Sequence, residues 1–341
     1  MLLDKIFGFL SNNIGIDLGT ANTAVYMQGR GIVMYEPSIV AIDVKTRKVL
    51  AVGKEAKEMV GKTPENIQAI RPLRDGVITD FEVTQVMLSY FIKRALGNTL
   101  FKPKPRVVIG VPTGITPVEK RAVIDAAKSA GAREVFLIAE PMAAAIGADL
   151  PIAEPLGNMV VDIGGGTTEI AVISLAGIVV STSMRVAGDE MNEAIIQYIK
   201  RQFHILIGEQ TAEKIKIELG SAVMEEEERN MDIRGRDMTG LPRTIKITNH
   251  NVTEALEDTV NSIINAIKVT LEKTPPELAS DIADRGIVLA GGGALLHNMD
   301  IRIQKETGIK AFYCDEPLIA VARGVGKILD NLELISRISM E

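Results

Sequence analysis

One short pattern occurs twice in this chain and constrains its fold more than any other feature. Residues 14–23 read IGIDLGTANT, and residues 160–169 read VVDIGGGTTE. In each, an apolar run is followed by Asp, one apolar residue, Gly and then small or hydroxyl residues. The apolar run is typical of a buried strand, and the Gly and Thr cluster is typical of a tight turn whose backbone N–H groups can cradle phosphate oxygens. The repeat therefore predicts two similar halves that face each other across one nucleotide.

A third segment strengthens this prediction. Residues 286–296 read GIVLAGGGALL, which is an apolar strand, three glycines and a helix-like run. A single glycine-rich turn is weak evidence, because such turns also serve to pack a helix against a strand. Three such segments in one chain favour a phosphate-binding role. The carboxylates at the two strand ends, Asp17 and Asp162, are then placed to hold a hydrated divalent cation.

Composition limits the class of protein. A chain of 341 residues that is 46% hydrophobic can form about two domains with sizeable cores. The net charge of −6 argues against a general nucleic-acid binder, which would show a basic face. The single cysteine, Cys314, excludes an intrachain disulfide, fits a reducing cytoplasm and is interpreted as a core thiol. No apolar run reaches the length of a membrane span, and the N-terminus lacks the cleavage site of a signal peptide.

Strand and helix signals alternate along the chain and predict an α/β fold in two related halves. In the first half we expect strands at 14–18, 23–28, 31–34, 38–43, 48–51, 106–111 and 134–138, and helices at 53–61, 82–98 and 116–131. In the second half we expect strands at 159–163, 169–174, 178–186, 230–236 and 243–248, and helices at 188–204, 209–220, 251–272 and 317–334. The last helix is expected to pack back on the first half, and the acidic run 225–228 is interpreted as a solvated loop.

Beyond these patterns, the chain resembles a known family. The three glycine-rich segments resemble the phosphate-1, phosphate-2 and adenosine motifs of the actin, sugar-kinase and heat-shock-chaperone ATPase superfamily. Longer stretches resemble the MreB family of bacterial actin homologues: IDLGTANT, EPS at 36–38, AIRPLRDGVI at 69–78, EPMAAAIGA, VVDIGGGTTEIAVISL, LIGEQTAEKIK, IRGRDMTGLPR and TPPELASDIADRGIVLAGGGALL. The resemblance covers residues 12–330.

The resemblance implies an α/β, actin-like fold of two duplicated domains, each with a larger inner and a smaller outer subdomain, and with a nucleotide in the cleft between them. It implies domain I at 13–148 with an outer subdomain at about 34–74, and domain II at 149–316 with an outer subdomain at about 187–246. The connection at 149–158, DLPIAEPLGN, holds two prolines. An amphipathic segment at 1–12 precedes domain I, and 317–341 is expected to be a C-terminal helix packed on domain I.

The same resemblance implies an ATP site with Mg²⁺. Phosphate contacts are implied for Gly19, Thr20, Ala21 and Asn22 on one side and for Gly164, Gly165, Gly166 and Thr167 on the other. Adenosine contacts are implied for Glu213, Lys216, Gly291, Gly292, Gly293 and Ala294. Without the resemblance, Glu213 and Lys216 would be interpreted as a surface ion pair on one helical face.

Three residues are implied to be catalytic for in-line attack of water on a γ-phosphate: Glu140, Asp162 and Thr167. Glu140 aligns with the residue that polarises the attacking water, and Thr167 would help to orient that water. Asp17 and Asp162 would hold Mg²⁺ through its waters, because Mg²⁺ sheds water reluctantly. Glu140 also has a simpler interpretation as a helix-start carboxylate favoured by the helix dipole. Ala139 departs from the family, which has a second acidic residue there, and we expect slower hydrolysis as a result.

Two apolar segments predict attachment to a membrane surface. The first, MLLDKIFGFL at 1–10, would present Leu2, Leu3, Ile6, Phe7, Phe9 and Leu10 on one apolar surface. In the second, Leu100 and Phe101 are followed by Lys102 and Lys104, a combination that suits an anionic membrane. The alternative for each segment is that it folds back on the protein's own core.

The resemblance implies a cytoplasmic cytoskeletal protein on the inner face of the cell membrane. Its expected partners are further copies of itself in paired antiparallel protofilaments, the anionic membrane and cell-wall elongation proteins, with no nucleic acid. Slow, filament-stimulated ATP hydrolysis would serve the maintenance of rod shape.

Three alternatives remain open from the residues. A small-molecule kinase would need a general-base Asp beside an acceptor pocket, and Asp75 and Asp80 look structural. A chaperone ATPase would be expected to continue into a peptide-binding domain beyond residue 341. A plasmid-segregating filament would not be expected to carry the apolar N-terminus or the Leu100–Phe101 loop.

Overall fold

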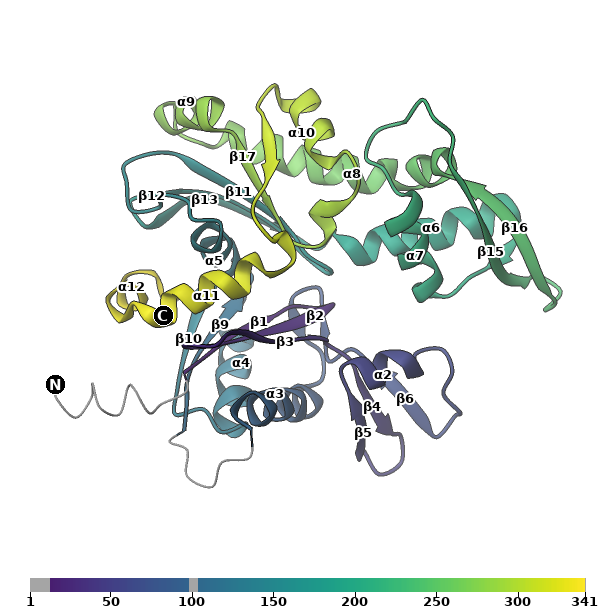
Figure 1. The fold of residues 1–341 in the computed structure, drawn as a ribbon, viewed down its shortest axis with the longest axis horizontal. Helices are drawn as coiled ribbons and strands as arrows, with labels where there is room; N and C mark the ends of the chain where they lie inside the picture. The colour runs from purple at the N-terminus through teal and green to yellow at the C-terminus, as the bar shows by residue number, and fades with distance from the viewer. Residues whose placement is uncertain (1–12, 98–103, 341) are drawn as a thin grey trace.

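The computed structural model describes residues 13–97 and 104–340 (Figure 1). The residues predicted to contact a membrane lie outside these ranges: Leu2, Leu3, Ile6, Phe7, Leu10, Leu100 and Phe101. Within the described ranges, no helix combines the length and the apolar character needed to cross a membrane.

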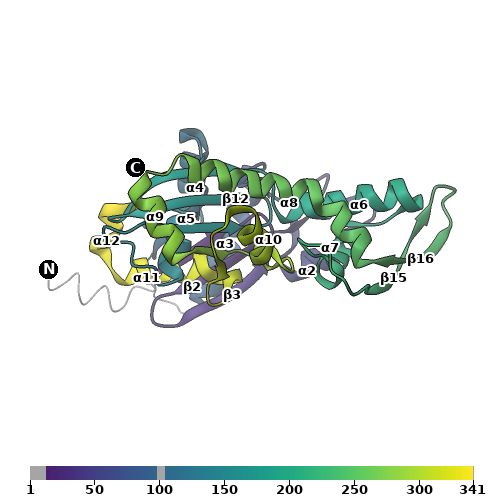
Figure 2. The same ribbon diagram turned by 90° about the horizontal axis from the view of Figure 1, so that it is seen from above.

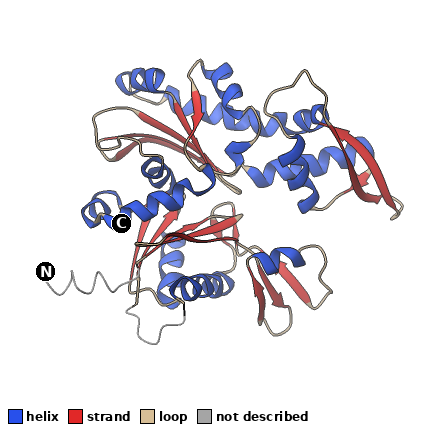
Figure 3. Cartoon of the chain, viewed as in Figure 1, coloured by secondary structure: helices blue, strands red, loops and turns tan. Residues whose placement is uncertain are grey.

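Two five-stranded sheets with the same topology form the centre of the molecule (Figure 3). The first has the order β10 (Glu134–Ala139), β9 (Arg106–Val111), β1 (Ile14–Leu18), β2 (Asn22–Met27) and β3 (Gly31–Pro37). The second has the order β18 (Ala311–Tyr313), β17 (Ile287–Ala290), β11 (Asn158–Ile163), β12 (Thr168–Ser174) and β13 (Gly177–Met184). In both, the central strand pairs antiparallel with the next strand and parallel with a much later one. The predicted duplication is confirmed.

The repeated motif occupies the same place in both sheets. β1 and β11 are buried along nearly their whole length, as their apolar runs predict for central strands covered on both faces. Asp17 of β1 lies opposite Gly110 of β9, and Asp162 of β11 lies opposite Ala290 of β17. Because the strands of each pair are parallel, both carboxylates lie at the carboxyl edge of a sheet, where α/β folds bind ligands.

Two helices, α5 (Glu140–Gly147) and α11 (Ala320–Asp330), cross between the sheets with their backbones in contact (Figure 1). A Cβ on Gly147 would lie 1.9 Å from the Ala320 carbonyl oxygen. A Cβ on Gly324 would lie 1.8 Å from the Ala143 carbonyl oxygen. One apolar cluster joins these helices to both sheets and includes Val108, Ala143, Val160, Ala171, Ile173 and Val325. As predicted, the C-terminal helix packs on the first half, and it also packs against the second.

The prediction of one continuous helix at 317–334 is wrong. The structure has a 3₁₀ turn, η2 (Pro317–Ile319), then α11, then a separate helix, α12 (Leu332–Ile338). Asn331 separates the two helices with φ −129° and ψ 88°, and its side chain accepts a hydrogen bond from the Leu334 amide at 3.2 Å. An Asn in this extended conformation ends one helix and caps the next.

Each half also carries a smaller sheet. In the first half, β4 (Val40–Asp43), β5 (Val49–Val52), β6 (Ile67–Ile70) and helix α2 (Lys54–Met59) enclose a small core of Ile39, Ala41 and Ala56. In the second half, β14 (Ile205–Leu206), β15 (Asn230–Asp237) and β16 (Pro242–Thr248) lie beside α6 (Gly188–Phe203) and α7 (Glu209–Leu219). Helix α8 (Asn249–Glu272) runs from this sheet across β12 of the large one, so their apolar cores are continuous (Figure 2).

The first sheet is also covered by α3 (Phe81–Leu96) and α4 (Pro117–Ser129), two helices that were predicted at 82–98 and 116–131. Several other elements were not predicted: β7 (Leu73–Arg74), β8 (Val77–Ile78), α9 (Pro276–Arg285), α10 (Met299–Thr307), β6 and β18. The run after the three glycines is only a 3₁₀ turn, η1 (Gly293–Leu295). Cys314 is half-buried rather than a core residue, and burial raises the pKa of its thiol to about 11.

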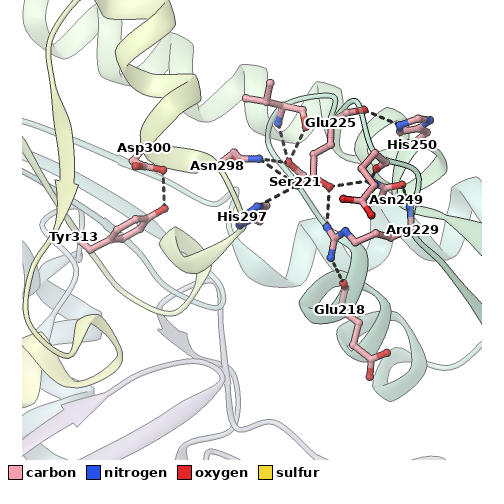
Figure 4. Close-up of polar contacts among 12 residues, drawn as sticks. Glu218, Ser221, Glu225, Arg229, Asn249, His250, His297, Asn298, Asp300 and Tyr313 are labelled. Carbon is pink, nitrogen blue, oxygen red and sulfur yellow. Dashed lines mark hydrogen bonds and ion pairs between the residues drawn. The ribbon is translucent and has the colours of Figure 1, made fainter.

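The acidic run 225–228 is not wholly a solvated loop (Figure 4). Its last three residues are exposed, but the Glu225 carboxylate accepts hydrogen bonds from Arg229 and Asn249, both at 2.8 Å. Asn298 donates a longer bond of 3.3 Å to the other Glu225 oxygen. Burial would raise the pKa of Glu225, but the bonds from Arg229 and Asn249 hold it below its ordinary value. Glu225 therefore joins the segment after α7 to the starts of α8 and α10.

Candidate functional site

A cavity of about 230 Å³ lies where the carboxyl edges of the two large sheets meet. Its walls contain nearly every site residue that the sequence predicted: Asp17, Gly19, Thr20, Ala21, Asn22, Glu140, Asp162, Gly164, Gly165, Gly166, Thr167, Glu213, Lys216, Gly291, Gly292 and Gly293. Ala294 is the exception, because it is fully buried in the apolar core of the second half. Residues far apart in the chain are thus brought together at one place.

The two glycine-rich turns face each other closely. A Cβ on Gly165 would lie 2.6 Å from the Ala21 Cβ, and one on Gly166 would lie 2.8 Å from Thr20 Oγ1. A side chain at either glycine would therefore push the opposing turn away. The Thr20 hydroxyl also accepts a hydrogen bond of 3.1 Å from the Gly76 amide. Two opposed turns of this kind can hold a chain of phosphates from both sides.

Four carboxyl groups cluster beside these turns. Burial raises the pKa of Asp17 to about 7. Burial, and then the charges of Asp17 and Glu169, raises the pKa of Asp162 to about 8. Burial, and then the charges of the other three groups, raises the pKa of Glu140 well above its ordinary value. Because like charges oppose each other's ionisation, a cation bound here would favour the ionised cluster.

Glu169 is a member of this cluster that the sequence analysis missed. It lies opposite Asp162 in the β11–β12 pair and is almost fully buried. Its carboxylate accepts hydrogen bonds from the Thr113 amide at 3.0 Å and from the Ser183 hydroxyl. Burial outweighs these bonds and raises its pKa. Since Thr113 follows β9, Glu169 ties the two halves together beside the cavity. Antiparallel pairing of the two strands predicted at 159–163 and 169–174 would have placed Glu169 opposite Asp162.

Glu140 is the first residue of α5 and directly follows β10. It is 8% exposed and lines the cavity. Ala139, at the N-cap position, makes no side-chain hydrogen bond to the helix. Glu140 is the acidic residue of the first turn. The helix start favours a carboxylate here, and the position also allows it to accept a proton from a water in the cavity. Both sequence interpretations of Glu140 are compatible with this geometry.

Glu213 and Lys216 both line the cavity, but each is bonded to a different partner. Lys216 donates to the Gly188 carbonyl at 2.7 Å, and burial lowers the pKa of its amine. Glu213 pairs at 2.9 Å with Lys57, which lies on α2 in the other half. The mutual surface ion pair that their spacing alone suggests is therefore not the arrangement found.

Several wall residues were not predicted: Tyr35, Lys57, Arg71, Asp189, Asn192, Ile217 and Leu318. Ile217 lies four positions after Glu213 on α7, so helical spacing could have placed it on the same face. Lys57 and Arg71 reach the cavity only because the outer part of the first half folds over it, which no local pattern reveals.

Asn192 of α6 indicates what kind of ligand would complete the cavity. It is 4% exposed, and its Oδ1 atom has no hydrogen-bond partner among the described residues. A buried acceptor left without a partner costs roughly 1–3 kcal/mol. A ligand with a hydrogen-bond donor near this wall would supply that partner, as the hydroxyl and amino groups of a nucleoside can.

The two aspartates considered for the kinase alternative, which would need a general-base Asp beside an acceptor pocket, both have structural positions. Asp80 caps α3 by accepting a bond of 3.1 Å from the Val83 amide, so its structural role is confirmed. Asp75 has φ +51° in a turn and is not among the residues that line the cavity. Neither geometry favours a general base beside an acceptor substrate.

Duplicated sheets with a cleft between them that is lined by two opposed glycine-rich turns define an actin-like protein. More specifically, the chain belongs to the MreB/Mbl protein family, whose model matches residues 11–337. It is 53% identical over 338 residues to the cell shape-determining protein MreB of Escherichia coli K12, covering 98% of this chain and 97% of that one. It is 51% identical over 328 residues to the cell shape-determining protein Mbl of Bacillus subtilis 168, covering 96% and 98%.

Solved structures give the same answer for the fold. The crystal structure of MreB5 of Spiroplasma citri bound to ADP matches with a TM-score of 0.88 and 39% identity, over 95% of this chain and 98% of that one. The structure of the same protein bound to AMPPNP matches with a TM-score of 0.90 and 38% identity, over 95% and 97%. The predicted actin-like fold is confirmed.

Proposed function

We propose that this protein is a cytoskeletal protein that determines cell shape. It binds ATP with Mg²⁺, hydrolyses it slowly, and polymerises into paired antiparallel protofilaments. The filaments lie on the inner face of the cell membrane and scaffold the proteins of cell-wall elongation. The observation that carries the proposal is the opposed pair of glycine-rich turns in an actin-like fold, in a chain 53% identical to a cell shape-determining protein. The relative crystallised with ADP and with AMPPNP, MreB5 of Spiroplasma citri, supports an adenine nucleotide as the ligand.

Asp17 and Asp162 fit a Mg²⁺ site. Both offer hard oxygen ligands. Both have raised pKa values, which a bound dication would lower, so that both groups would be ionised. The described residues contain no group of three or more His, Cys, Asp or Glu side chains arranged to hold a metal. Two carboxylates suit an ion that keeps most of its ligands as water and phosphate. When bound, Mg²⁺ neutralises charge on the phosphates.

Hydrolysis is assigned to Glu140 and Thr167. The Glu140 carboxylate is held at the start of α5, where it would orient the attacking water and accept its proton. Thr167 closes the second turn, where its carbonyl accepts a bond of 2.8 Å from the Gly164 amide, and its hydroxyl would hold the water in line. Backbone N–H groups of both turns would stabilise charge on the phosphates. Ala139 leaves the position directly before Glu140 in the chain without a carboxylate, which we expect to slow the reaction.

We also propose the division into domain I at 13–148 and domain II at 149–316, with outer subdomains at about 34–74 and 187–246. The small sheets support this division, because β4, β5 and β6 lie in the first outer range and β14, β15 and most of β16 in the second. The separate core under α2 supports a distinct outer unit in domain I.

The proposal is tested by mixing the purified protein with ATP, Mg²⁺ and anionic liposomes and examining the pellet by electron microscopy. Nucleotide-dependent filaments that lie flat on the membrane are expected. Protein that remains soluble and monomeric with every nucleotide would contradict the proposed function. ATP turnover that depends on an added sugar or acetate would instead favour a kinase.

Attachment to the membrane is proposed for the apolar segments at 1–10 and 100–101. Deletion of residues 1–10 should reduce co-sedimentation with anionic liposomes, because apolar burial and attraction to anionic lipid both contribute to interfacial binding. Filament formation without liposomes serves as the control for folding. Unchanged pelleting of the deleted protein would exclude this segment as the main anchor.

A further inference from the structure

Helix α2 of the first half and helix α7 of the second meet at the cavity through polar groups. Lys57 Nζ lies 3.2 and 2.9 Å from the two carboxylate oxygens of Glu213. Gln210 Nε2 donates a hydrogen bond of 2.9 Å to the Lys57 carbonyl. The buried core under α2, which contains Ala56, shares no residue with the buried core under α7. Charge and hydrogen bonds therefore hold this contact.

A second contact across the same cleft involves different partners. Arg71, which follows β6, lies 3.2 Å from the Asp189 carboxylate at the start of α6. Arg71 also pairs with Glu209 at the start of α7. Arg71 and Asp189 line the cavity, as Lys57 and Glu213 do. The two contacts close the cleft together, but only the Lys57 contact involves Glu213.

Glu213 retains the capacity to bind a ligand while it is held by Lys57. An ionised carboxylate offers about four acceptor positions on its two oxygens. Lys57 engages each oxygen once, which leaves further positions for donors from the cavity that Glu213 lines. A ribose carries two adjacent hydroxyl donors that suit a carboxylate with a fixed orientation, and a charged acceptor makes such bonds strong.

We propose that Lys57 is a positioning residue for nucleotide binding. By holding both oxygens of Glu213, it orients this carboxylate to accept hydrogen bonds from the ribose hydroxyls. Recognition of the sugar in domain II then depends on a side chain supplied by the outer part of domain I. The inference rests on the proposed nucleotide-binding function and adds to it the residue that makes sugar recognition sensitive to the contact across the cleft.

The test compares binding of ATP, 2′-deoxyATP and 3′-deoxyATP, each with Mg²⁺, to the full chain. The wild type should bind ATP about 10-fold or more tightly than at least one deoxy analogue, as expected for a lost hydrogen bond to a charged group. Lys57→Met keeps the apolar stem and removes the ammonium group. It should weaken ATP binding and bring the ratio of the affinity for ATP to the affinity for the deoxy analogue close to one. Lys57→Arg should recover part of this preference for ATP.

Arg71→Met is the matched control, because it removes the other cross-cleft contact without touching Glu213. It should weaken the binding of all three nucleotides by the same factor and so preserve the ratio of their affinities. Thermal unfolding without nucleotide establishes that each variant is folded. A wild-type ratio in Lys57→Met, or an equal loss of the ratio in Arg71→Met, would overturn the inference. A wild type that binds ATP without any preference would also overturn it and leave the proposed function intact, whereas a wild type that binds no nucleotide would refute that function itself.

Discussion

Replacing Gly324 with Ala tests whether the close crossing of α5 and α11 positions the chemistry. The new Cβ would lie 1.8 Å from the Ala143 carbonyl oxygen, whereas ordinary contact begins at 3.4 Å. The helices would have to separate by about 1.6 Å, the difference between these distances. Overpacking of this kind costs roughly 1–3 kcal/mol, and the better helix propensity of Ala offsets about 1 kcal/mol of it. We expect the free energy of unfolding to fall by up to about 2 kcal/mol.

Thermal unfolding and ATP turnover, measured on the same preparation, check this expectation. The melting temperature should fall by up to roughly 3 °C. Turnover at a temperature where the variant is folded should fall by about 10-fold or more, because α5 begins with Glu140 and small displacements of a catalytic group are costly. Gly177→Ala is the control, since its Cβ would meet nothing closer than 3.6 Å. Unchanged melting temperature and turnover in Gly324→Ala would refute the reasoning.

Three further predictions concern the cavity. Glu140→Gln should reduce ATP turnover by about 100-fold or more while ATP affinity changes little, because the amide cannot accept the proton of the attacking water; equal turnover in steady-state assays would remove Glu140 from the mechanism. The raised pKa values of Asp17 and Asp162, about 7 and about 8, mean that the folded state binds more protons than the unfolded state between pH 4 and 8. The nucleotide-free protein should therefore lose stability as pH rises through this window, and Asp162→Asn should flatten the loss; melting curves that rise with pH would contradict the shifts. Asn192→Leu should leave the melting temperature unchanged or higher, since it removes an unpartnered buried amide, yet weaken ATP binding by about 10-fold in a titration; unchanged affinity would show that the ligand does not reach this wall.

The parts of the fold and of the site that the sequence predicted are those that depend on residues close together in the chain. Strand β1, its turn and β2 lie within 14–27, and the same holds for β11 and β12 within 158–174. Apolar runs fix such strands and glycines fix such turns with little help from the rest of the chain. The strand before Glu140 was predicted for the same reason, from its apolar run at 134–138, whereas Glu140 itself was singled out by the family resemblance of EPMAAAIGA.

The parts that were missed depend on how distant segments meet. Lys57 contacts Glu213 and Arg71 contacts Asp189 across more than a hundred positions, so their roles follow from the orientation of the two halves. Asn331 looked like part of an amphipathic helix until its extended backbone broke the helix in two. Glu225 looked like one of several solvated acids until the start of α8 supplied Asn249 as a partner.

The shared topology of the two large sheets has a consequence for the direction in which a ligand can lie. Around the two glycine-rich turns the two halves are near equivalents, so this region alone would accept a ligand in either of two opposite orientations. The equivalence ends at the next strand: β17 leads into Gly291, whose φ is +83°, whereas its counterpart β9 leads into Pro112. The cavity wall formed by Gly291, Gly292 and Gly293 and by Glu213, Lys216 and Ile217 of α7 belongs to the second half. The duplicated turns form the part of the cavity that the two halves share. The difference between the segments that follow β9 and β17 then sets which way round a ligand can lie.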